Sequence, residues 1–243
     1  MKTLVDIILV VFILLGTYAG VRKGLIKSLV SFIGLVAIVI ISYTLRVHLA
    51  NFLIDKLPFF NFGGILSEIS SINILIYNIL SFIVIFVLLY CVLNIVLAVT
   101  GFIDTLLKFT VIWIIPSKIG GAIIGFLESW VFIYLVLFVL TQFSVTNSFI
   151  KDSTISNVVL DHTPIVGTYL GGASKAANKI YTTIEEYSKD ETKTKDDLDL
   201  YILQIQIEHG IISKDKATEL LQRGKIGLKN VMIAEGENQW LNI

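Results

Sequence analysis

Cysteine, proline and charge of either sign are scarce in this chain of 243 residues. Its one cysteine, Cys91, has no partner for a disulfide within the chain, so a disulfide framework is excluded. Charged residues make up 16% of the sequence, and 19 basic residues balance 19 acidic ones. A neutral chain without a basic face gives no electrostatic reason to expect nucleic acid as a partner. Cys91 lies in an apolar run, where we expect a small buried hydrophobic residue.

Patterns that bind cofactors or carry out catalysis are also missing. The three histidines, His48, His162 and His209, are scattered, and none has metal-ligand spacing or a nucleophile motif around it. No P-loop or dinucleotide fingerprint is present. Asp161 and His162 come nearest to a catalytic pair, but sequence neighbours in a loop are usually solvated turn residues. We therefore expect no enzyme activity, no catalytic residues, no cofactor and no metal site.

Apolar residues, by contrast, are abundant. They account for 55% of the chain, and the mean hydropathy of +0.83 is typical of integral membrane proteins. A helix needs about 20 predominantly apolar residues to cross the hydrocarbon core. Four stretches meet this requirement, at about 4–21, 25–45, 73–99 and 119–142. The sequence therefore predicts an all-α protein with an integral membrane module of four transmembrane helices.

Two partly apolar segments lie between these spans. The uncharged run within 106–118 is too short to span, and we expect Pro116 to end a helix there. We therefore expect 106–118 to lie in the membrane interface. The segment 46–72 is half apolar with a turn signal at Pro58, which predicts an amphipathic stretch on the membrane surface.

Composition divides the chain into three regions. Residues 1–145 form the four-span domain. Residues 146–190 are rich in polar and small residues, which predicts an extramembrane linker with one or two short helices. Residues 191–243 predict a small helical extramembrane tail, in which Ser213 caps a helix and Gly210 ends one. A tail of this size cannot hold a large core, so we expect it to contact a partner, the membrane surface or another copy.

Small residues recur at every fourth position in two places. They are Gly16, Gly20 and Gly24 near the end of the first span, and Ser117, Gly121, Gly125 and Ser129 in the fourth. On a helix, residues with this spacing line one slowly rotating face and let a second helix approach closely. The alternative is that glycine is simply frequent in membrane helices. We favour helix packing, either between spans one and four or between subunits.

An acidic residue, Glu128, interrupts the fourth span. At about 1.5 Å per residue it lies roughly 15 Å from Lys118, near the middle of the hydrocarbon core. A carboxylate at that depth is costly unless it is protonated, paired or hydrated. We expect Glu128 on the small-residue face, where it either hydrogen-bonds Asn78 or Asn94 of the third span or lines a wet crevice in which protons or a partner act. The alternative is that the span is shifted and Glu128 lies at an aqueous edge.

Further landmarks lie at the start of the chain. Asp6 opens the first span in LVDIILV, and GVRKGLIKSLVSFIGLV follows with the cations Arg22, Lys23 and Lys27. Together with the glycine repeat IGGAIIGFLES at the start of the last span, this pattern resembles the colicin V production protein (CvpA) family of bacterial inner-membrane proteins. The resemblance covers residues 1 to about 145.

The resemblance implies a multi-pass protein of the bacterial inner (plasma) membrane that is linked to production or secretion of peptide toxins of the colicin V type. A similar four-span module anchors a serine protease domain in some bacterial proteins. Glu128 and Ser129 stand where the family usually has an arginine followed by a glycine, so the role of that arginine does not carry over.

Two function classes remain open. The first is a non-enzymatic scaffold or accessory factor in toxin production, secretion or another envelope process, with the lipid bilayer and other membrane or envelope proteins as partners. The second is a transporter or channel for a small solute or protons, built by a homo-oligomer. Glu128 and the polar Asn78 and Asn94 favour the second class, whereas the small-residue ladders and the helical tail favour the first.

Overall fold

The computed structural model describes most of the chain, namely residues 2–67, 69–107, 114–142, 150, 152–189, 194–228, 231–233 and 240–242. The chain divides into two compact units. Unit 1 comprises Met1–Leu45 and Phe82–Gly171, and unit 2 comprises Arg46–Ser81 and Gly172–Ile243. Three of the described helices therefore have residues in both units: Leu25–Lys56, Ile72–Leu107 and Val166–Tyr187.

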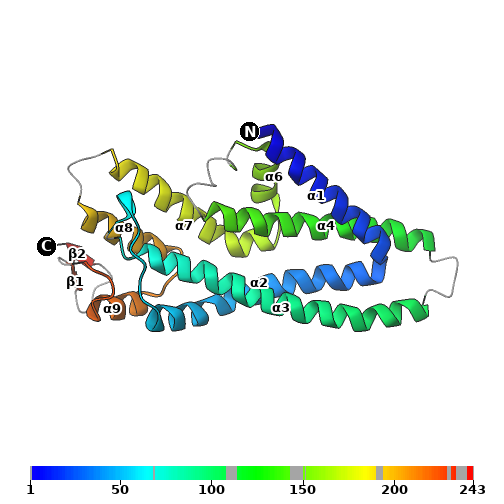
Figure 1. Cartoon of the computed structure of the whole chain (residues 1–243), viewed down its shortest axis with the longest axis horizontal. Coiled ribbons are helices and arrows are strands. Elements are labelled where there is room, and N and C mark those ends of the chain that lie inside the picture. Colours follow the sequence, from blue (N-terminus) through cyan, green and yellow to red (C-terminus); the bar gives the residue numbers. More distant parts are fainter. Residues whose placement is uncertain are drawn as a thin grey trace. The chain divides into compact units, whose positions relative to one another are not determined.

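Four long helices dominate the fold (Figure 1). They are α1 (Lys2–Lys23), α2 (Leu25–Lys56), α3 (Ile72–Leu107) and α4 (Ile114–Thr141). By length and composition, four segments of these helices can cross a membrane: Leu4–Lys23, Leu25–Lys56, Ile72–Ala98 and Pro116–Thr141. The prediction of an all-α, four-span membrane protein is confirmed.

The turn between α1 and α2 depends on one glycine. Gly24 has a φ of +78°, a left-handed conformation that side chains disfavour, and its N–H donates to the carbonyl of Gly20. Arg22 and Lys23 lie in the last turn of α1, where cations complement the helix dipole. Because Leu25 follows Gly24 directly as the first residue of α2, the chain reverses with a single residue between the helices.

The expectation for 46–72 was partly wrong. Residues 46–56 continue α2 instead of lying on the membrane surface. Nothing in this stretch breaks a helix until Pro58, which disfavours helical conformation in the residue before it. Between α2 and α3 the structure describes a short 3₁₀ helix, Gly64–Leu66.

The role expected for Pro116 was also wrong, because it lies in the first turn of α4 instead of ending a helix. Proline is tolerated there since the first turn needs no N–H donor. Residues 108–113 lie outside the described part of the chain, so the interfacial position expected for 106–118 stays a prediction.

Large apolar side chains remain exposed along the spanning helices. On α1 and the unit 1 part of α3 they include Leu4, Ile7, Leu14, Leu88, Val92 and Ile95. Cys91 of α3, which was expected to be buried, is exposed as well. In a spanning helix such exposure places side chains against lipid, which is as apolar as the side chains themselves. The burial rule for cysteine in soluble proteins therefore does not transfer to this site.

The described part of the segment 146–190 includes two helices of nine residues or more. They are α6 (Thr154–His162), which contacts α1 and α4, and α7 (Val166–Tyr187). The Ser153 hydroxyl caps α6 by accepting the N–H of Ser156 at 3.1 Å. Helix α7 has 22 residues and is longer than the short helices expected here.

The tail in unit 2 contains α8 (Lys195–Glu208) and α9 (Lys214–Gln222), as the sequence predicted. Ser213 caps α9, and Gly210 has a φ of +66° just after α8. The C-terminal strands β1 (Val231–Ile233) and β2 (Trp240–Asn242) were not expected. They form a small antiparallel pair.

Candidate functional site

Helices α1 and α4 touch backbone to backbone in unit 1. A Cβ added to Gly20 would overlap the carbonyl oxygen of Gly121 and lie 2.7 Å from the Cα of Gly125. A Cβ added to Gly125 would lie 2.6 Å from the carbonyl oxygen of Gly16, and one added to Gly16 would overlap the Ser129 side chain. No residue larger than glycine fits at these positions without moving a helix. We call this contact the α1–α4 seam.

The seam continues to the α1–α2 turn. A Cβ added to Gly121 would lie 3.0 Å from the carbonyl carbon of Gly24. The N–H of Leu25 donates to Ser117 Oγ at 3.1 Å, so α4 satisfies an amide that begins α2. The structure thus brings both predicted small-residue ladders together between spans one and four of the same chain.

The acidic residue of α4 joins three helices. Lys23 Nζ at the end of α1 lies 3.0 Å from Glu128 Oε1 and 3.1 Å from Oε2. Ser31 Oγ of α2 donates to Glu128 Oε1 at 2.7 Å. The Glu128 side chain is 16% exposed and that of Lys23 is 32% exposed. The charge of Glu128 is therefore met by an opposite charge and a hydroxyl donor, which offsets the cost of removing it from water.

The partners expected for Glu128 were wrong. Asn78 Nδ2 donates to the Ile74 carbonyl at 2.9 Å, and Asn94 Nδ2 donates to the Tyr90 carbonyl at 2.8 Å. Both amides thus bond to their own helix. The sequence did not indicate Lys23 as the partner, because a cation at the end of a span is usually placed at the membrane edge. Its long apolar side chain lets the ammonium group reach a carboxylate deeper in the membrane.

Asp6 holds the start of α6. Its Oδ1 accepts the hydroxyl of Ser153 at 2.5 Å and the N–H of Ile155 at 3.1 Å. A carboxylate at a helix N-terminus satisfies free amides and complements the helix dipole. The acidic landmark of the first span therefore connects α1 to a segment more than 140 positions later.

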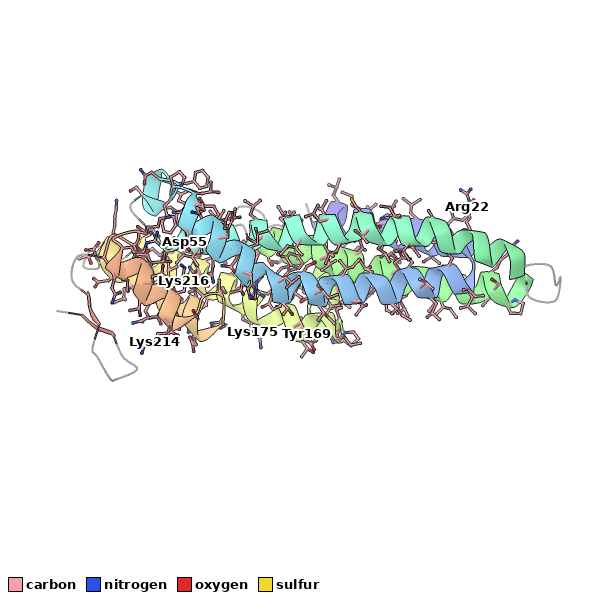
Figure 2. All side chains as sticks on the ribbon, turned by 90° about the horizontal axis from the view of Figure 1, so that it is seen from below. Arg22, Asp55, Tyr169, Lys175, Lys214 and Lys216 are labelled. Carbon is pink, nitrogen blue, oxygen red and sulfur yellow. The ribbon has the colours of Figure 1, made fainter. Side chains whose placement is uncertain are left out.

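The other two cationic landmarks lie away from this network. Arg22 is exposed and projects outward at the end of α1 (Figure 2). Lys27 is half-buried in the first turn of α2. Neither residue has an ion pair within the described ranges, so only Lys23 of the three cations joins Glu128.

A charged cluster in unit 2 was missed by the sequence reasoning. Lys216 Nζ of α9 lies 2.9 Å from both carboxylate oxygens of Asp55 at the end of α2, and Figure 2 labels this pair. Arg223 joins Asp55 at 2.8 Å and Glu219 at 2.9 Å. Lys225 donates to the Ile54, Asp55 and Leu57 carbonyls. These charges fix α9 and the residues after it to the C-terminal end of α2.

The start of α3 is held by a second carboxylate that was missed. Asp199 of α8 is 2% exposed and accepts the N–H of Ser70 at 3.0 Å and that of Ser71 at 2.7 Å, besides the Ser71 hydroxyl. Burial raises the pKa of Asp199 against the opposing effect of these hydrogen bonds. The sequence signal that could have indicated this residue is its place as an acid within the apolar run LDLYILQI.

The described residues hold no group of three or more His, Cys, Asp or Glu side chains that could bind a metal ion. Asp161 and His162 are exposed at the end of α6, and His162 Nδ1 lies 3.2 Å from the Val158 carbonyl. What the described residues show at this site is a packing seam with one ion pair, between Lys23 and Glu128.

Comparison with known proteins gives one family and one relative. The family model described as colicin V production protein matches residues 5–164. A protein of Bacillus subtilis (strain 168), described as "uncharacterized transmembrane protein YshB", is 28% identical over 179 residues. That alignment covers 70% of this chain and 94% of the relative. No solved structure matches significantly. The family match contains the seam, Glu128 and its partners, Asp6 and the whole of α6.

Proposed function

The chain belongs to the colicin V production protein family, and from this membership we propose that it is a non-enzymatic scaffold or accessory factor in the bacterial cell membrane. It holds other membrane or envelope proteins in place during production or secretion of peptide toxins of the colicin V type, or during a related envelope process. The family description supports the link to toxins, and the four spans support the membrane location.

The bonding of Glu128 is the observation that carries this proposal. Lys23 and Ser31 satisfy its carboxylate within the fold, so the charge has a structural use. Along the α1–α4 seam the glycine backbones are in contact, which leaves no space for a solute between these two helices. A rigid helix pair of this kind is suited to presenting surfaces, and α8 and α9 add an extramembrane surface for docking.

The proposal is tested in cells that export a peptide toxin of the colicin V type. Exported toxin is measured against the amount of folded protein in the membrane for the wild type, Glu128→Gln and Gly20→Leu. A scaffold predicts that export follows the amount of folded protein in all three. A Glu128→Gln protein that is present at wild-type level and supports no export would contradict it.

A proton or small-solute path formed by an oligomer is the second candidate. It is favoured by the position of Glu128 and Lys23 inside the spanning helices, because ionisable residues in membrane spans often mark ion or proton pathways. This candidate requires measurable flux across a vesicle membrane that depends on Glu128. A scaffold requires no such flux.

A further inference from the structure

Helix α6 and the turn into α7 carry exposed apolar side chains. Val158 is 42% exposed, Ile165 is 56% exposed and Tyr169 is 50% exposed. Tyr169 projects outward from α7 (Figure 2). Ile165 has a φ of +62°, which is rare for a β-branched residue. Such a conformation persists only where the surroundings hold it, so the position of this turn is fixed by its contacts.

The first of these contacts gives the depth of the start of α6. Asp6, which holds Ser153 and Ile155, lies 17 positions before Lys23, the last residue of the first span. At about 1.5 Å per residue, Asp6 is about 25 Å from the Lys23 end, within a hydrocarbon core about 30 Å thick. Helix tilt reduces this height further. The N-terminal end of α6 therefore lies at the membrane boundary opposite the α1–α2 turn.

The second contact gives the depth of the other end. Trp130 Nε1 donates to the hydroxyl of Thr163, the C-cap of α6, at 3.0 Å. Trp130 lies 14 positions after Pro116, so it is about 21 Å from the start of the fourth span. A Cβ added to Gly167 would lie 3.9 Å from the Tyr134 ring, which places the first turn of α7 beside the same helix. The end of α6 is therefore deeper than its start.

We propose that α6 and the α6–α7 turn lie in the membrane interface, with Val158, Ile165 and Tyr169 in contact with lipid. Asp6 and Trp130 lie about 25 Å and about 21 Å from the side of the α1–α2 turn in a hydrocarbon core about 30 Å thick, so α6 lies in the outer third of the core, just below the headgroups, where the surrounding medium is lipid rather than water. This position differs from the extramembrane linker that composition predicted for 146–190. An interfacial helix carries both polar and apolar residues, so the composition of 146–190 is compatible with the proposed position.

The polar side chains of α6 agree with this position. Asn157 and Asp161 are four positions apart and exposed, so they form one row on the helix. At the start of α6 the Ser153 hydroxyl donates to Asp6. At its end the Thr163 hydroxyl accepts from Trp130 and donates to the Val159 carbonyl. Both hydroxyls are therefore satisfied in a medium of low polarity. In the proposed position the exposed polar row and the exposed His162, four positions after Val158, reach toward the headgroups, while Val158 contacts the acyl chains.

Nitroxide labels on single cysteines test the proposal in vesicles of phosphatidylethanolamine and phosphatidylglycerol. Val158→Cys, Ile165→Cys and Tyr169→Cys are made in a Cys91→Ala background. The wild-type chain labelled at Cys91, exposed on α3, is the lipid standard, and Lys175→Cys, exposed on α7, is the aqueous standard. Collision rates with molecular oxygen, which concentrates in lipid, and with a water-soluble nickel chelate are compared by electron paramagnetic resonance.

We expect the oxygen-to-nickel ratio at Val158→Cys and Ile165→Cys to approach that of Cys91 and to exceed that of Lys175→Cys several-fold. A ratio equal to that of Lys175→Cys at both positions would overturn the proposal in favour of an aqueous α6. Low collision rates with both reagents would also overturn it, since a second copy or a protein partner would then cover the segment. The readout measures position alone, so it is independent of the scaffold proposal, and three labelled positions keep the test valid if one variant fails to fold.

Discussion

Lys23 and Glu128 are 105 positions apart in the chain, yet Lys23 Nζ lies 3.0 Å from Glu128 Oε1. The pair joins the end of α1 to the middle of α4, and Ser31 adds α2 to the contact. Three of the four spanning helices therefore meet at one carboxylate. In a bilayer, where helices gain little from burying apolar surface against each other, such a bond and the glycine contacts beside it are the specific sources of attraction.

Removal of either charge should destabilise the protein by leaving the other charge without a partner. We expect Glu128→Ala to cost about 1–3 kcal/mol, less than for a fully buried pair because Lys23 is partly exposed. Glu128→Gln should cost less, since its amide oxygen still accepts from Ser31. The double variant Lys23→Ala with Glu128→Ala should be less destabilised than the sum of the single ones. Unfolding in detergent measures the stability of Glu128→Ala, Glu128→Gln, Lys23→Ala and the double variant. Additive effects of the two alanine substitutions would show that the two side chains do not interact.

Larger residues in the seam should separate α1 from α4. We expect Gly20→Leu and Gly121→Leu to lower thermal stability in detergent far more than Leu14→Ala, which removes an exposed side chain. Overpacking typically costs about 1–3 kcal/mol, and more where backbone is the obstacle. Gly171→Ala is the control, because nothing lies within 4 Å of its added Cβ. Equal stability of the Gly20 and Leu14 variants would contradict the close contact.

The sequence predicted the small residues of the α1–α4 seam but not the bonding partners of Glu128. Four-residue spacing is a local property, so the ladders could be found from Gly16 to Gly24 and from Ser117 to Ser129 without a structure. The partner of Glu128 could not, because its distance from Lys23 depends on how three helices are arranged. Asn78 and Asn94 were plausible alternatives by composition, but each amide reaches its own backbone first.

The lengths of the helices likewise depend both on local sequence and on contacts with distant residues. Hydropathy located the four spans well because lipid imposes a length on each helix. It ended the second span at residue 45, whereas α2 continues to Lys56. The last turns of α2 are held by tertiary contacts with Lys216, Arg223 and Lys225, and no local pattern encodes these contacts.

Asp6 should control the attachment of α6. Asp6→Ala removes the acceptor for Ser153 and Ile155, and a lost helix cap costs about 1 kcal/mol. We expect faster amide exchange in residues 154–162 with little change in α4. Asp6→Asn is the matched control, because a single oxygen, Oδ1, accepts both bonds and an amide oxygen can replace it. If Asp6→Ala leaves exchange in α6 unchanged, the helix is held by other contacts.

Acid should loosen α9. Hydrogen bonds from Lys216 and Arg223 lower the pKa of Glu219 below its ordinary value of 4.5. A lowered folded-state pKa means that the stabilisation is fully present above about pH 4.5 and is lost as the pH falls through the lower folded value. We expect amide exchange in 214–222, corrected for intrinsic rates, to accelerate below pH 4.5. Glu219→Gln should weaken this dependence but not abolish it, because the same two cations also lower the pKa of Asp55. An unchanged pH profile in that variant would assign the dependence to Asp55 alone.

We propose that Glu128 has a structural role and conducts no protons, and proton flux through reconstituted vesicles tests this role. Purified protein is inserted into vesicles with a pH gradient and a pH-sensitive dye inside, and the wild type, Glu128→Gln and empty vesicles are compared. We expect the same slow proton leak in all three, while Glu128→Gln unfolds at a lower temperature than the wild type. Proton flux above that of empty vesicles in the wild type, abolished by Glu128→Gln, would contradict a purely structural role.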